Sequence, residues 1–203
     1  MNFKLIAAIT LFASAGAANA GVIVIDPTSD GAIYTCAGCN PVSNGELLVS
    51  GYIQGVVKFS SAGIDGVVES ALLSVNPLAL PLWGPIVDVY GYGTELGALD
   101  ASDGFAGTFL GSWTLPSLTY GQDAFFDVTS FVAGTNAPFV AFNLRTAPGG
   151  TDVFSSLEQN YGHPAQLTVT TRSVPEPSTL GLFAAGIVGL GLIPRRRRAV
   201  FKV

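Results

Sequence analysis

The chain has 203 residues, enough for one ordinary domain with targeting segments, and its 49% apolar residues suffice for a hydrophobic core. This content excludes disorder over most of the chain. Charged residues make up only 11%, against about 25% in a typical soluble protein, and the 25 glycines and 12 prolines exceed average usage. The composition therefore argues against a helix-rich cytosolic enzyme. The formal net charge of −5 averages over segments of opposite character.

Residues 1–20 have the pattern of a signal peptide. Lys4 precedes an apolar stretch over residues 5–15, and Ala18-Asn19-Ala20 is the small-x-small pattern that signal peptidase accepts. The apolar stretch is too short to span about 30 Å of hydrocarbon, which disfavours a permanent N-terminal anchor. We therefore expect signal peptidase to cut between Ala20 and Gly21, and the mature chain to leave the cytoplasm.

Residues 21–172 are predicted to form one exported domain. Residues 21–174 contain 13 acidic residues and only three basic ones, a net charge of −10. Such a surface repels phosphate groups, and no basic stripe is present, so nucleic acid is excluded as a partner.

Cys36 and Cys39, in Cys-Ala-Gly-Cys, are the two cysteines of the chain. Outside the cytoplasm, each has only the other as an intramolecular partner, and the neighbouring Gly38 and Pro41 indicate a turn. We expect a small disulfide that closes the loop between the first strands. The alternatives are a thioredoxin-like redox pair, which would need to begin a helix, and a zinc site, which would need two more strong ligands.

Apolar residues of this domain recur with a period of two, as in half-buried strands. The segments with this alternation, or with short β-rich runs between Gly, Pro, Asn and Asp clusters, are 47–59, 67–75, 86–92, 108–115, 125–129, 139–145, 153–156 and 167–171. No connection has room for a crossover helix. The prediction is an all-β, jelly-roll-like antiparallel β-sandwich, flanked by the signal peptide and by a single C-terminal hydrophobic helix.

The order of these strings resembles the DNRLRE-type exported jelly-roll domain. The matching strings are Val57-Lys58-Phe59-Ser60, Val68-Glu69-Ser70-Ala71-Leu72-Leu73-Ser74-Val75, Val87-Asp88-Val89-Tyr90, Phe126-Asp127-Val128-Thr129, Val140-Ala141-Phe142-Asn143-Leu144 and Phe154-Ser155-Ser156-Leu157-Glu158. The eponymous Asn-Arg-Leu-Arg-Glu string is absent. The resemblance implies a relationship to carbohydrate-binding modules.

Residues for catalysis or ligand binding are few. His163 is the only histidine and lies in a turn-forming Gly-His-Pro string, and no nucleophile elbow, Walker loop or metalloprotease helix occurs. We assign no catalytic or metal-ligating residues and expect no enzyme. A structural calcium ion remains an option, through loop carboxylates such as Asp26, Asp30 or Asp127. The side chains that we consider for stacking on a sugar ring are Trp83, Tyr92 and Tyr120.

The C-terminus has three parts in a fixed order. Residues 173–179 form a Pro-rich linker that contains Val174, Pro175, Glu176 and Pro177, residues 180–194 form a short apolar and glycine-rich transmembrane helix, and residues 195–203 form a basic tail. Arg195, Arg196, Arg197 and Arg198 stay in the cytoplasm under the positive-inside rule, so they act as the membrane stop and leave the domain outside. The helix is marginal in length and contains weak helix formers, which suits a transient anchor.

This arrangement resembles the PEP-CTERM sorting signal of exopolysaccharide-producing Gram-negative bacteria. The resemblance implies recognition by an exosortase, an integral-membrane cysteine transpeptidase-like enzyme, with cleavage at or near Pro175-Glu176-Pro177 and loss of the tail. We therefore expect an inner-membrane-tethered intermediate, followed by the cell surface or the extracellular matrix.

The sequence favours a non-enzymatic surface or matrix protein, structural or weakly glycan-binding in exopolysaccharide or biofilm. The first alternative is a secreted carbohydrate-active hydrolase that uses a carboxylate pair. The second is a periplasmic redox protein that uses Cys36 and Cys39.

Overall fold

In the computed structural model, residues 20–37, 42–43, 45–78, 86–114, 121–146, 150–157 and 162–172 are described, and all belong to one compact unit, Asn19–Ser173. The strands are β1 (Ala20–Ile25), β2 (Ser29–Tyr34), β3 (Val42–Ser43), β4 (Leu47–Ser50), β5 (Ile53–Ser60), β6 (Val67–Val75), β7 (Ile86–Thr94), β8 (Thr108–Thr114), β9 (Ala124–Asp127), β10 (Phe139–Thr146), β11 (Thr151–Phe154) and β12 (Gln166–Arg172). The helices of these residues are the 3₁₀ turn η1 (Ala101–Phe105) and the short α1 (Thr129–Gly134).

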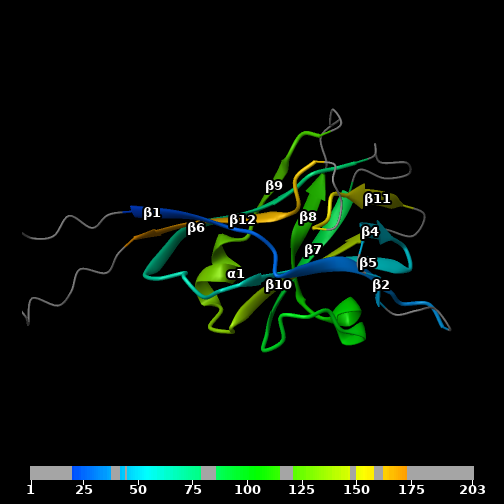
Figure 1. Cartoon of the computed structure of the whole chain (residues 1–203), viewed down its shortest axis with the longest axis horizontal. Coiled ribbons are helices and arrows are strands. Elements are labelled where there is room, and N and C mark those ends of the chain that lie inside the picture. The colour runs from blue at the N-terminus through cyan, green and yellow to red at the C-terminus, as the bar shows by residue number, and fades with distance from the viewer. Residues whose placement is uncertain are drawn as a thin grey trace, which may run out of the picture. The chain divides into compact units, whose positions relative to one another are not determined.

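The strands form two antiparallel sheets (Figure 1). The smaller sheet has the order β1-β12-β6-β9, and the larger one has β11-β4-β5-β10-β7-β8, with β2 paired to β5 and β3. All strand pairs are antiparallel, and the pairs join segments far apart in sequence, such as β1 with β12 and β5 with β10. The predicted antiparallel β-sandwich is confirmed.

The core lies between the sheets, where each strand places alternate side chains. The larger sheet contributes Val57, Phe59, Val89, Phe142 and Leu144, and the smaller sheet contributes Ala71, Leu73, Leu167 and Val169, all fully buried. These are the inward positions that the alternation of β6, β10 and β12 predicts. On the last of these strands Thr168 and Thr170 alternate with Leu167 and Val169 and are half-buried.

Two local differences from the prediction have a clear cause. The predicted strand 47–59 is divided into β4 and β5 by a turn at residues 51–52. The predicted strand 125–129 ends at Asp127, because the Asp127 carboxylate accepts a hydrogen bond from the Thr129 amide at 2.9 Å and opens α1. Hydrogen bonding from the Thr129 hydroxyl, and then from its amide, lowers the pKa of Asp127.

Candidate functional site

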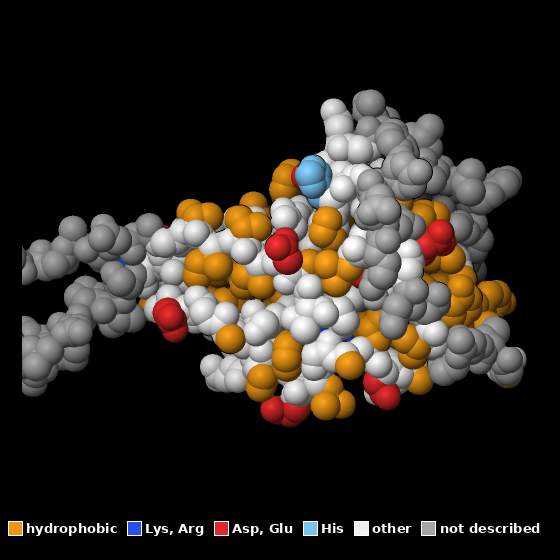
Figure 2. Space-filling model, in the orientation of Figure 1, with side chains coloured by type: hydrophobic (Ala, Val, Ile, Leu, Met, Phe, Trp, Pro, Cys, Tyr) orange, Lys and Arg blue, Asp and Glu red, His pale blue; other side chains and the backbone are white. Residues whose placement is uncertain are grey.

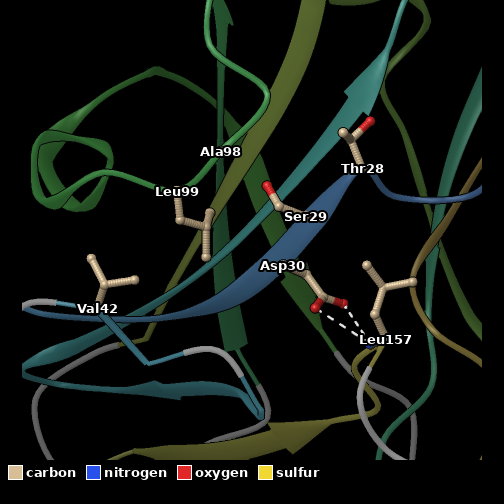
Figure 3. Close-up of a pocket in the computed structure, with 7 residues that line it drawn as sticks. All are labelled: Thr28, Ser29, Asp30, Val42, Ala98, Leu99 and Leu157. Atoms are coloured by element: carbon tan, nitrogen blue, oxygen red, sulfur yellow. Dashed lines mark hydrogen bonds between the residues drawn. The ribbon is translucent and has the colours of Figure 1, made fainter.

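A pocket lies where the start of β2 faces the connection between β7 and η1 (Figure 3). Its volume is about 300 Å³, at the lower end of the range for ligand pockets. It is lined by Thr28, Ser29, Asp30, Val42, Ala98, Leu99 and Leu157, which come from four separate parts of the chain. The pocket thus combines an apolar wall with hydroxyl and carboxylate groups, as small-molecule sites commonly do.

Asp30 supplies the acidic group of this pocket. Its side chain points toward Leu157, whose amide donates to the two carboxylate oxygens at 3.3 and 3.1 Å. Asp30 is only 1% exposed, so the surrounding residues enclose its carboxylate almost completely. The bond to Leu157 ties β2 to the segment that follows β11.

The opposite wall is held by a buried ammonium group on β5. Lys58 Nζ donates to the carbonyl of Ala98 at 2.7 Å and to that of Leu96 at 3.3 Å. On the β2 side, Ser29 Oγ donates to the carbonyl of Gly97 at 2.6 Å. Because three successive bonds fix residues 96–98, the pocket wall is built into the fold.

Lys58 also forms an ion pair that is shielded from water. Its Nζ lies 2.8 Å from Asp103 Oδ2, and the two side chains are 1% and 7% exposed. Asp103 Oδ2 accepts in addition from the Asp100 amide at 2.6 Å, and Asp100 Oδ1 accepts from the Ser102 amide, so that a capping box closes η1. The hydrogen bond from the Ser102 hydroxyl, at 2.7 Å, and then the one from the Ser102 amide lower the pKa of Asp100.

The polar face of the larger sheet continues under η1. Asn143 Nδ2 donates to the Asp103 carbonyl at 2.7 Å, and an Arg145 guanidinium nitrogen donates to the Ala106 carbonyl at 2.8 Å. The Arg145 guanidinium lies 3.9 Å from the centre of the Tyr90 ring, a cation–π contact. The connection between β7 and β8 therefore covers this face of the sheet.

Tyr92 belongs to the same covered face. Its hydroxyl is buried, and its ring centre lies 6.0 Å from Lys58 Nζ. Burial, and then the nearby Asp103 carboxylate, raise the pKa of Tyr92 above its usual range. The hydroxyl is thus enclosed, and the predicted contact of Tyr92 with a glycan stays a prediction.

The other predicted site residues are distributed as follows. Ala20 and Gly21 lie in β1, paired with Arg172 and Thr171 of β12. His163 is exposed before β12, in agreement with a turn position. Outside the described residues lie Ala18, Cys39, Trp83, Tyr120, Val174, Pro175, Glu176, Pro177, Arg195, Arg196, Arg197 and Arg198.

Three features therefore stay predictions. Because the structure describes Cys36 and not Cys39, it leaves the disulfide untested. No group of three His, Cys, Asp or Glu side chains suited to a metal forms among the described residues, and the structural calcium ion stays a prediction. No helix in the described ranges has the length and apolarity needed to cross a membrane, and the predicted helix 180–194 falls outside them.

Sequence reasoning did not find the pocket or the Lys58–Asp103 pair. The pocket has no sequence signal, because its residues come from four segments. Lys58 did carry one, since it is one of three basic residues in a domain with 13 acidic ones and lies within an apolar strand. A charge at such a position is usually paired.

The described residues form an antiparallel β-sandwich that ends with β12 at Arg172. The C-terminal segment, Val174–Val203, lies outside this compact unit. A family model described as the PEP-CTERM protein-sorting motif matches residues 173–197. No curated protein matches the chain. The motif supports an exosortase-targeted exported protein that is sorted through a membrane-anchored stage to the cell surface.

Proposed function

We propose that the chain is a surface or extracellular-matrix protein that an exosortase releases from the inner membrane, and that its β-sandwich acts without catalysis, as a structural or weakly glycan-binding unit in exopolysaccharide. The observation that carries this proposal is the sorting motif at residues 173–197, which begins one residue after β12 ends at Arg172. The cleavage region at residues 175–177 is thus within a few residues of the folded unit. Removal of the tail would leave all described strands intact.

The acidic surface of the domain fits the same role. With 13 acidic and three basic residues over positions 21–174, the domain remains soluble and does not bind anionic polymers through a basic patch. A neutral glycan is therefore the favoured ligand class, recognised by hydroxyl hydrogen bonds and apolar contact. The pocket that contains Thr28, Asp30 and Leu157 supports this choice because it offers both kinds of group.

The release step predicts a defined mature mass. In the native host, the wild-type protein is expected to lose everything after the Pro175-Glu176-Pro177 region, including the four arginines. Replacing Pro175, Glu176 and Pro177 together by Ala should leave the tail attached and the protein in the membrane fraction. Intact-mass spectrometry of the fractionated host measures both outcomes.

Glu69→Ala is the matched control, because Glu69 is an exposed acidic residue on β6 and outside the sorting motif. It should be processed like the wild type. A wild-type protein that retains Arg195 to Arg198 at the cell surface would contradict the proposal.

Glycan binding predicts a loss of affinity when the pocket is filled. Ala98→Trp adds a large side chain at the pocket wall and keeps the Ala98 carbonyl that Lys58 binds. We expect about tenfold weaker retention on neutral exopolysaccharide from the host, equivalent to about 1.4 kcal/mol. Affinity electrophoresis measures the change.

Ala62→Trp, on an exposed turn, is the control and should not alter retention. Equal retention of the Ala98→Trp and Ala62→Trp variants would remove the pocket from the proposal.

A further inference from the structure

β1 is an edge strand with an open side. Among the described residues it pairs only with β12, at the end of the order β1-β12-β6-β9. An edge strand presents unpaired backbone N–H and C=O groups, which can pair with a strand of another chain. Its outward side chains Val22 and Val24 are 67% and 56% exposed. Figure 2 shows apolar side chains gathered on the molecular surface around β1, β12 and β6 of Figure 1.

β1 lacks the features that usually protect an edge. Its sequence, AGVIVI, contains no charge and no proline, and its register with β12 is continuous from Ala20 to Ile25. The other edges differ. β9 has four residues and ends in the exposed Asp127, β8 has a bulge against β7, and Pro77 bridges Phe154 of β11.

We infer that β1 of one molecule pairs antiparallel with β1 of a second copy of this chain, so that the two four-stranded sheets become one continuous sheet across a two-fold axis. The strand is self-complementary. With the axis at Ile23, Val22 lies opposite Val24 of the second copy, and the exposed valines of both copies form cross-strand pairs on one face. The inference goes beyond the proposed function, because it concerns assembly and not sorting.

The charges beside the two ends of β1 favour pairing with a second copy of the chain, and they favour the antiparallel over the parallel direction. Arg172 lies on β12 opposite Ala20, and Asp26 follows the last residue of β1 and accepts a hydrogen bond from Gln166. In the antiparallel pair, Asp26 of the second copy falls opposite Ala20, two strand spacings, or about 10 Å, from the backbone of Arg172. The exposed Arg172 side chain lies 3.5 Å from Glu69 in the single molecule, and it is long enough to turn toward the Asp26 carboxylate of the second copy over this distance. A parallel pair would place like charges together at each end.

The negative charge of the remaining surface would confine contact between two copies to the β1 edge. Two domains with a net charge of −10 repel one another over most orientations. β1 itself is uncharged, with Arg172 of β12 beside one end and Asp26 directly after the other. Cleavage before Gly21, which the sequence predicts, would remove Ala20 and leave the α-ammonium group of Gly21 next to the vacated position, beside Arg172 and facing Asp26 of the second copy, which strengthens the same complementarity.

Sedimentation equilibrium of the processed protein, purified from its host, tests the inference. The wild type is expected to form a dimer in a concentration-dependent manner. Val24→Lys should raise the dissociation constant by about tenfold or more, because the two-fold axis introduces the charge twice. Ile86→Lys, at a 49% exposed position on β7 in the other sheet, is the control and should dimerise like the wild type.

A charge exchange separates this arrangement from other dimers. Asp26→Arg and Arg172→Asp should each weaken the dimer, and the double variant should restore it. Thermal unfolding and circular dichroism verify that each variant is folded. A monomeric wild type, a dimer that Val24→Lys leaves unchanged, or a double variant that fails to recover would overturn the inference, and the mass of the processed chain tests sorting separately.

Discussion

Replacing Lys58 by Met is expected to destabilise the domain by about 3–5 kcal/mol, because the change leaves the Asp103 carboxylate buried without its cation. Lys58 and Asp103 are 1% and 7% exposed and 2.8 Å apart, so water cannot replace the lost partner. The carbonyls of Leu96 and Ala98 lose their donor in the same step. Urea unfolding of the processed protein, monitored by circular dichroism, measures the change.

The matched control is the exposed ion pair of the same domain. Arg172 and Glu69 lie 3.5 Å apart, with side chains that are 58% and 40% exposed. Glu69→Gln should cost less than about 1 kcal/mol, as exposed pairs usually do. If Lys58→Met lowers the free energy of unfolding no more than Glu69→Gln does, then the buried pair does not stabilise the packing of the β7–β8 connection on the larger sheet.

A double variant, Lys58→Met with Asp103→Leu, refines the result. It removes both charges, so no unpaired carboxylate remains buried, and the free energy of unfolding should recover a large part of the loss. The carbonyls of residues 96 and 98 would still lack their donor, so recovery should be incomplete. Under the proposed function, the double variant should also be retained more weakly than the wild type on neutral exopolysaccharide, because residues 96–98 form a wall of the pocket.

The strands that face the core could be predicted from the sequence because burial of one face makes every second residue apolar. Along β6, the residues Ala71, Leu73 and Val75 point into the sandwich, and the observed bounds equal the predicted 67–75. The other face could not be predicted in the same way. Asn143 and Lys58 alternate with core residues and would be expected at the surface, yet both are buried because η1 and its flanking residues cover them.

The candidate site shows the same limit. The sorting motif is local, so sequence alone predicted it, and the family match over residues 173–197 confirms it. The pocket is assembled by tertiary contacts, among them the bonds from Lys58 to Ala98 and from Ser29 to Gly97. Those pairs are separated by 40 and 68 residues, a distance at which periodicity and turn chemistry are uninformative.

Phe142→Ala is expected to have an effect of similar size, about 3–5 kcal/mol, through the core between the sheets. Phe142 is fully buried on β10, the strand between β5 and β7. Its ring centre lies 6.1 Å from that of Phe59 and 5.7 Å from that of Phe131, the latter with rings edge to face. Truncation removes both aromatic contacts and leaves a cavity where α1 packs on the sheet.

Phe109→Ala is the control for this change. Phe109 also contacts an aromatic ring, with 5.5 Å between its centre and that of Tyr90, but it is 52% exposed on β8. Its truncation creates no enclosed cavity and should cost less than about 1.5 kcal/mol. Urea unfolding under identical conditions measures the free energy of unfolding of both variants.

A cavity formed by removing Phe142 has a further signature. Because its lining is apolar, benzene should bind it and raise the melting temperature of Phe142→Ala while leaving the wild type and Phe109→Ala unchanged. A small loss of stability together with no benzene effect would mean that the sheets close over the vacated space. In that case the residues around Phe142 can relax into the space it leaves. The position of α1 would then depend on its other core contacts, such as those of Val132.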